Sequence, residues 1–102
     1  MSVYAEAMLL LLPPDVGGRW LPVAPRDGSY RPFVRIDEQT SRMRLLEGPP
    51  ELAPGDEARV MLEVESDAAE IFRGGEYPIL EDDERIVGIV TVLRVCGRSI
   101  PV

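Results

Sequence analysis

Three residue types are missing from this 102-residue chain, which contains no Lys, no His and no Asn. Without His there is no imidazole to act as a general base or as a metal ligand. Without Lys the chain cannot form the phosphate-binding Gly-x-x-x-x-Gly-Lys loop, which excludes nucleotide hydrolysis by that mechanism. The single cysteine, Cys96, excludes an intramolecular disulfide and any zinc site built from several Cys residues.

Long apolar runs are also absent. The most apolar run, residues 7–12, ends at Pro13 and Pro14, whereas a membrane helix needs roughly 20 apolar residues. The residues before it carry no basic side chain, although a signal peptide begins with a basic region. We therefore expect a cytoplasmic protein with no membrane partner, in which this run forms a buried strand.

The charge balance is acidic. Against 18 Asp and Glu residues stand 11 basic residues, all of them Arg, for a net charge of −7 at pH 7. The excess lies in residues 51–84, which hold 12 acidic residues and two Arg. Because affinity for a phosphate backbone comes from positive surface, nucleic acid is an unfavourable partner. The acidic region favours a basic protein partner, or it serves solubility alone.

Proline and glycine divide the chain into short segments that leave no room for long helices. Alternating or β-branched apolar residues between them predict strands at residues 4–12, 30–36, 42–46, 58–65, 76–80 and 86–95. In residues 58–65, Val60, Leu62 and Val64 share the expected buried face, with Glu63 on the exposed face. Residues 66–72 have room for one helical turn. The pattern predicts one all-β domain over residues 1–102, a small barrel or sandwich.

Four turn signals occur in order along the chain. Residues 17–22 read Gly-Gly-Arg-Trp-Leu-Pro, residues 30–32 Tyr-Arg-Pro, residues 54–56 Pro-Gly-Asp and residues 85–88 Arg-Ile-Val-Gly. They resemble the C-terminal β-barrel domain of elongation factor Tu, which reads Gly-Gly-Arg-His-Thr-Pro, Tyr-Arg-Pro-Gln-Phe, Met-Pro-Gly-Asp and Gly-Arg-Thr-Val-Gly at similar spacings. The resemblance implies a six-stranded antiparallel β-barrel of the translation-factor type. It also implies the contacts that this barrel makes in the family, with aminoacyl-tRNA, a GTPase domain and an exchange factor.

The chain departs from this family where the family meets RNA. A glycine-rich, basic turn near the final strand is replaced by four carboxylates, which would repel a phosphate backbone: Glu81, Asp82, Asp83 and Glu84. The family's His after Gly-Gly-Arg is Trp20, and its Gln after Tyr-Arg-Pro is Phe33. We therefore predict that tRNA binding has been lost.

The acidic run and the cysteine are the remaining candidates for chemistry. Carboxylates bind Ca²⁺ and Mg²⁺, but consecutive turn residues point in different directions and the EF-hand spacing is missing. This favours a solvated hairpin turn for residues 81–84, with no metal or cofactor. Cys96 is expected to be a small core residue, with no His to activate it. We expect no enzyme, although an enzyme with an unrecognised acidic site stays open as an alternative.

Five residues are candidates for a binding surface: Arg19, Trp20, Tyr30, Arg31 and Phe33. Arg, Trp and Tyr are the types enriched at binding hot spots. Trp20 either faces a partner or folds back to cap the barrel end, and Arg19, Arg26, Arg31 and Arg35 are expected to form a basic rim. We expect a non-catalytic module that binds a protein, as a monomer or as a weak homodimer through exposed strand edges. The alternative is a translation-associated factor that contacts tRNA, the ribosome or a translation factor.

Overall fold

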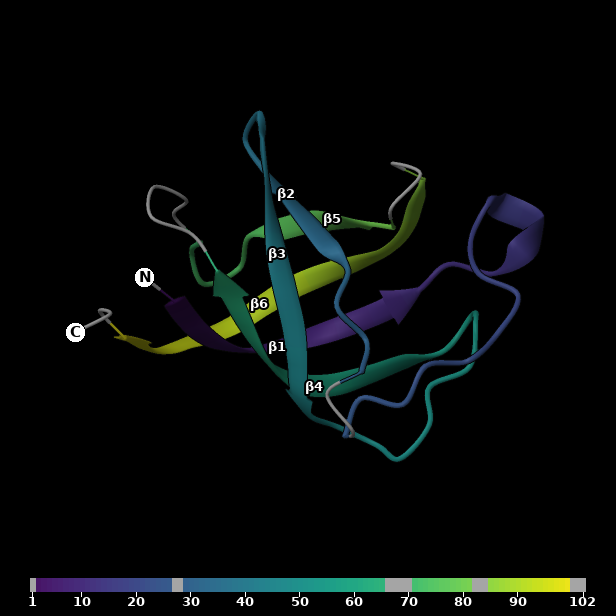
Figure 1. The fold of residues 1–102 in the computed structure, drawn as a ribbon, viewed down its shortest axis with the longest axis horizontal. Helices are drawn as coiled ribbons and strands as arrows, with labels where there is room; N and C mark the ends of the chain where they lie inside the picture. Colours follow the sequence, from purple (N-terminus) through teal and green to yellow (C-terminus); the bar gives the residue numbers. More distant parts are fainter. Residues whose placement is uncertain (1, 27–28, 66–70, 82–84, 100–102) are drawn as a thin grey trace.

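The computed structural model describes residues 2–26, 29–65, 71–81 and 85–99. Their elements are β1 (Ser2–Leu11), the 3-10 helix η1 (Pro14–Val16), β2 (Phe33–Ile36), β3 (Gln39–Glu47), β4 (Glu57–Glu65), β5 (Glu76–Leu80) and β6 (Ile86–Ser99). The strands pair antiparallel and close into a barrel in the order β1-β4-β3-β2-β5-β6 (Figure 1). The prediction of an all-β, six-stranded antiparallel barrel is confirmed. No helix in the described ranges is long and apolar enough to cross a membrane.

All six predicted strands are present, and they differ from the prediction mainly at their ends. β5 has the predicted bounds, whereas β3 and β6 run further than expected. β2 begins at Phe33, not at Tyr30, because Pro32 has no N–H to donate to a neighbouring strand. The Pro32 carbonyl still accepts a hydrogen bond from the Met43 amide at 2.9 Å. The helical turn predicted at 66–72 falls largely outside the described residues.

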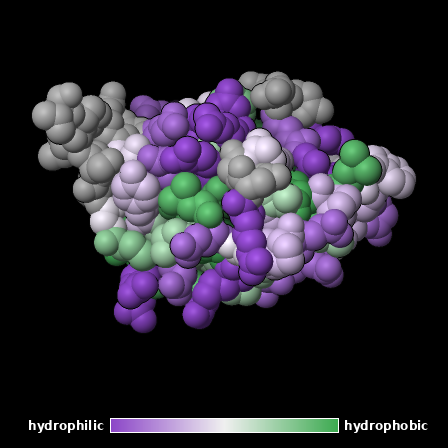
Figure 2. Space-filling view, turned by 60° about the horizontal axis from the view of Figure 1, so that its bottom comes forward, coloured by the Kyte–Doolittle hydropathy of each residue, from purple (hydrophilic) through white to green (hydrophobic). Residues whose placement is uncertain are grey.

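The core fills the inside of the barrel. Alternate residues of β1 point inward and are almost completely buried: Val3, Ala5, Ala7, Leu9 and Leu11. The predicted strand over residues 7–12 is confirmed as far as Leu11, and its burial is confirmed for the inward-facing residues. The residues between them, such as Met8 and Leu10, are half-buried on the outer face. On the face drawn in Figure 2, hydrophobic residues lie in small separate groups among hydrophilic ones.

Gly88 of β6 allows this strand to approach β1 closely. A Cβ atom at this position would lie 2.7 Å from the backbone oxygen of Leu10 on β1, which is closer than real Cβ atoms come. The β5–β6 register shifts at the same place, so that Val87 is an extra residue between the pairs Ile79–Gly88 and Leu80–Ile86. A glycine inside a strand is typical of a bulge or of a close backbone approach, and Gly88 has both.

Glu63 corrects one prediction. It lies on the outer face of β4 as expected, but it is only 7% exposed. Tyr4 of β1 lies opposite it in the register, and Arg44 of β3 donates a hydrogen bond from Nη2 to Oε1 at 2.7 Å. Burial acts to raise the pKa of the Glu63 carboxyl, but hydrogen bonds from Ser2, Tyr4 and Arg44 and the Arg44 charge outweigh it and hold the pKa below its ordinary value.

Cys96 gives a further correction, whereas the strand edges leave their prediction open. Cys96 is exposed, because the register between β1 and β6 shifts there and leaves it as an extra residue between Val95 and Gly97. The prediction that it is a core residue is therefore wrong. In the closed barrel each strand has two hydrogen-bonded neighbours, but β2 and β5 pair through only Phe33–Leu80 and Val34–Ile79, so a weak homodimer through strand edges stays a prediction.

Candidate functional site

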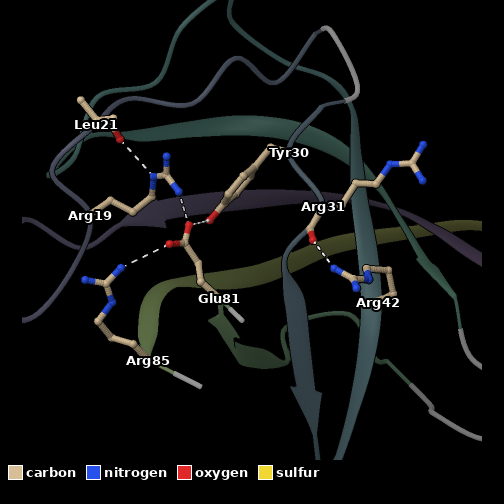
Figure 3. A network of polar contacts seen from close by, with 7 residues as sticks. All are labelled: Arg19, Leu21, Tyr30, Arg31, Arg42, Glu81 and Arg85. Carbon is tan, nitrogen blue, oxygen red and sulfur yellow. Dashed lines mark hydrogen bonds and ion pairs between the residues drawn. The ribbon is translucent and has the colours of Figure 1, made fainter. Parts of the chain in front are cut away.

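Glu81, the residue that follows β5, is the centre of a network of polar contacts (Figure 3). Its Oε2 atom accepts a hydrogen bond from the Tyr30 hydroxyl at 3.0 Å and forms an ion pair with Arg19. Its Oε1 atom lies 3.3 Å from Nη2 of Arg85. The Glu81 side chain is only 21% exposed, so the prediction of a solvated turn is wrong at this residue. Asp82, Asp83 and Glu84, the rest of the predicted acidic patch, lie outside the described residues.

The turn after β1 brings Arg19 to this network. Gly17 has φ +87°, in the left-handed region that glycine enters without strain. A Cβ atom on Gly18 would overlap the backbone carbonyl of Leu12, and the Gly18 amide donates to the Pro13 carbonyl at 3.0 Å. Two glycines are therefore needed for the chain to fold back against the end of β1. This end of the barrel lies opposite the two chain termini (Figure 1).

Tyr30 fixes Arg19 from a second side. The Arg19 guanidinium carbon lies 5.0 Å from the centre of the Tyr30 ring, a cation–π contact, and Arg19 Nε donates to the Leu21 carbonyl at 3.0 Å. Burial and then the charge and hydrogen bond of Glu81 raise the pKa of the Tyr30 phenol, against the opposite effect of Arg19. The phenol is therefore a neutral hydrogen-bond donor at physiological pH, and it holds Glu81 in place.

Arg31 and Phe33, two further predicted binding residues, belong to a separate group around Arg42 of β3. Arg42 Nη1 donates to the Arg31 carbonyl at 2.8 Å, and its guanidinium carbon lies 4.1 Å from the centre of the Phe33 ring. The Arg31 side chain is exposed and points away from Glu81 (Figure 3). The structure thus brings Arg19 and Tyr30 together, and it leaves Arg31 and Phe33 outside their network.

Trp20 and Leu21 form an exposed apolar pair, which we name the Trp20 surface. Their exposed fractions are 80% and 69%, so the alternative in which Trp20 caps the barrel is wrong. Leu21 was not among the predicted binding residues, although it stands beside Trp20 in the turn signal that drew attention to this loop. The Trp20 and Leu21 side chains project from a loop that Arg19 ties to the barrel.

Arg85 was also not predicted as a site residue, because its ion pair with Glu81 depends on how the chain returns from β5 to β6.

Two of the four residues predicted to form a basic rim, Arg19 and Arg26, make contacts of their own. Arg19 is paired with Glu81. Arg26 donates to the Gly48 carbonyl at 2.6 Å and lines a hollow together with Arg59 of β4. Arg35 belongs to β2. Arg19 and Arg26 therefore bind to different parts of the barrel.

No protein-family model and no curated protein matches the chain. Within the described ranges, no group of three Cys, Asp or Glu side chains is placed to hold a metal ion. Inferences about function therefore rest on the Trp20 surface, on the charged side chains and on the order of the turn signals.

Proposed function

We propose that the chain is a non-catalytic binding module that recognises a protein partner through the Trp20 surface. The observation that carries this proposal is the contrast between exposure and order in one loop. Trp20 and Leu21 are largely exposed, while Arg19 beside them is held by Glu81, by Tyr30 and by the Leu21 carbonyl. A tryptophan on a loop that is already ordered loses little conformational entropy on binding, and tryptophan is the residue type most typical of binding hot spots.

The charge of the chain supports a basic partner. Its net charge is −7, with the excess in residues 51–84. Glu81 neutralises Arg19 at the base of the Trp20 surface, so this loop adds no positive charge that would repel such a partner. Complementary charge increases the rate of association and selects among partners, while an aromatic side chain that becomes buried on binding supplies the affinity. The partner we propose is a basic protein with an apolar pocket for Trp20.

The test is affinity capture with the wild-type chain and with Trp20→Ala, followed by calorimetry on each purified partner. Phe72→Ser is the matched control, because Phe72 is also a large exposed apolar residue but lies outside the Trp20 surface. We expect Trp20→Ala to weaken binding by about 30-fold or more, as for a hot spot worth about 2 kcal/mol. Equal affinities of the wild type and Trp20→Ala for every captured partner would refute the proposal.

A translation-associated role is the second candidate, and the four ordered turn signals favour it. Their order resembles the C-terminal domain of elongation factor Tu, and a closed six-stranded antiparallel barrel is the architecture that this resemblance implies. In this proposal the partner of the Trp20 surface is a translation factor or a ribosomal protein, and tRNA binding has been lost. Co-sedimentation with ribosomes in a Trp20-dependent manner would support it. A salt-dependent affinity for tRNA, micromolar or tighter, would contradict the loss of tRNA binding.

A further inference from the structure

A second charged cluster lies on the outer face of the barrel, where β1 runs between β4 and β6. Glu6 of β1 is its centre. Its Oε1 atom lies 3.5 Å from Nη1 of Arg59 on β4, and its Oε2 atom lies 3.4 Å from Nη2 of Arg94 on β6. The order of the strands therefore places one guanidinium group on each side of a single carboxylate.

These residues line a shallow hollow of about 530 Å³ together with Arg73 and Leu93. Three positive side chains thus face one negative side chain, in a protein whose net charge is −7. The side chains of Arg59 and Arg94 are 67% and 68% exposed. Their contacts with Glu6 are longer than the roughly 2.8 Å of a close charge-assisted hydrogen bond. Most of their N–H donors therefore remain available to a ligand in the hollow.

We propose that this hollow binds the phosphate group of a small phosphorylated molecule. A phosphate monoester carries nearly two negative charges and three acceptor oxygens, which matches the excess of two positive charges and the donors of several guanidinium groups. A carboxylate would leave one positive charge without compensation. A long nucleic acid would have to continue from the hollow across an acidic surface, where its phosphates would be repelled.

An adjoining hollow gives room for the rest of such a molecule. It has a volume of about 570 Å³, shares Glu6 and Arg59 with the first, and extends along β4 to Arg26 and Glu47. Both hollows have the size of small-molecule sites in proteins. Two Arg and two Glu side chains line the second hollow, together with Leu46, Val60 and Met61. This lining is neutral overall and suits the uncharged part of a phosphorylated molecule.

Calorimetry at constant ionic strength tests this proposal with inorganic phosphate, glycerol phosphate, a phosphoserine peptide and the matching aspartate peptide. We expect saturable binding of both small phosphates, with glycerol phosphate bound more tightly than inorganic phosphate. Arg73→Gln and Arg94→Gln should each weaken binding by about tenfold, the loss of one charge-assisted hydrogen bond. Arg35→Gln is the matched control, since Arg35 lies on β2 across the barrel, and its affinity should equal that of the wild type.

Four results would overturn the proposal. The first is that inorganic phosphate does not saturate the chain at about 10 mM, far above the concentrations at which a specific site fills. The second is that Arg35→Gln loses as much affinity as Arg73→Gln and Arg94→Gln. The third is that the aspartate peptide binds as tightly as phosphate, and the fourth is that the phosphoserine peptide binds more tightly than glycerol phosphate. The last result would identify a phosphorylated protein as the ligand. Thermal unfolding of each variant confirms that it is folded. Trp20→Ala should bind phosphate like the wild type, so that this proposal and the proposed function succeed or fail separately.

Discussion

Replacing Glu81 with Ala should lower the stability of the whole barrel. The substitution removes three contacts at once: the ion pair with Arg19, the hydrogen bond from Tyr30 and the longer ion pair with Arg85. It also leaves the Arg19 guanidinium, which is only 20% exposed, without its carboxylate. A charge that loses its partner in a partly buried position keeps its desolvation cost, which makes the loss larger than that of a surface ion pair.

The size of the effect follows from the exposure of each partner. A hydrogen bond to a charged group contributes about 1.5–3 kcal/mol when it is buried, whereas an exposed ion pair contributes about 0–1 kcal/mol. The Arg19 and Tyr30 contacts belong nearer the first class, and Arg85, whose side chain is 42% exposed, belongs to the second. Because the contacts share one carboxylate, their contributions do not simply add. We expect a loss of about 2–3 kcal/mol, and a fall in Tm of roughly 10–20 °C for a domain of this size.

Urea and thermal unfolding followed by circular dichroism measure this loss. Glu76→Ala is the matched control, because Glu76 is an exposed carboxylate on the neighbouring strand β5, and its effect should stay within about 0.5 kcal/mol. Glu81→Gln keeps an acceptor for Tyr30 without the charge and should fall between the two. A double-mutant cycle between Glu81→Ala and Arg19→Ala should give a coupling of about 1 kcal/mol or more. A loss no larger than that of Glu76→Ala would refute the view that this network fixes the loop.

Three further predictions concern the core, the acid stability and the Trp20 surface. Gly88→Ala should destabilise by about 1–3 kcal/mol, because its Cβ would meet the Leu10 backbone. Gly97→Ala on the same strand has free space and should change stability by less than about 0.5 kcal/mol; equal effects in urea unfolding would contradict the close approach. The pKa of Glu63 is lower in the folded state than its ordinary value of 4.5, so stability should fall as the pH falls below that value. Glu63→Gln should give a flatter pH profile, and an unchanged slope would contradict the shift. Trp20, the single tryptophan, should be quenched by acrylamide nearly as well in the folded chain as in urea, and strong protection in the folded chain would contradict its exposure.

The strands of this barrel could be predicted because their signals are local. Val60, Leu62 and Val64 alternate with polar residues, and the prolines and glycines mark where each segment ends. The position of Glu63 could not be predicted from the same alternation. The alternation places it correctly on the outer face, but its burial depends on Tyr4 and Arg44, which belong to the two neighbouring strands. A period of two indicates the face of a residue and says nothing of what covers that face.

The network at Glu81 shows the same limit at the candidate site. Read along the chain, Glu81 is the first of four acidic residues and suggests a solvated turn. Its closest partners, Arg19 and Tyr30, lie 62 and 51 residues away in the sequence. The composition of the run therefore could not indicate that its first member is paired. The turn signals did indicate the loop, because two adjacent glycines are typical of a sharp bend, and the structure shows that the backbone at Gly17 and Gly18 requires them.

The charged hollow changes what the acidic composition excludes. Arg59 stands in the most acidic region of the sequence and Arg94 near its basic end, yet the barrel places both beside Glu6. A net charge of −7 acts over the whole surface, so it opposes a long polyanion that must cross much of that surface. A single phosphate responds mainly to the charges within a Debye length of about 8 Å, and in the hollow these include three Arg side chains against one Glu. Acidity therefore argues against nucleic acid as a partner without arguing against a small phosphorylated ligand. A weaker affinity of Arg73→Gln than of the wild type for glycerol phosphate would show that the charges in the hollow, and not the net charge of the chain, govern phosphate binding.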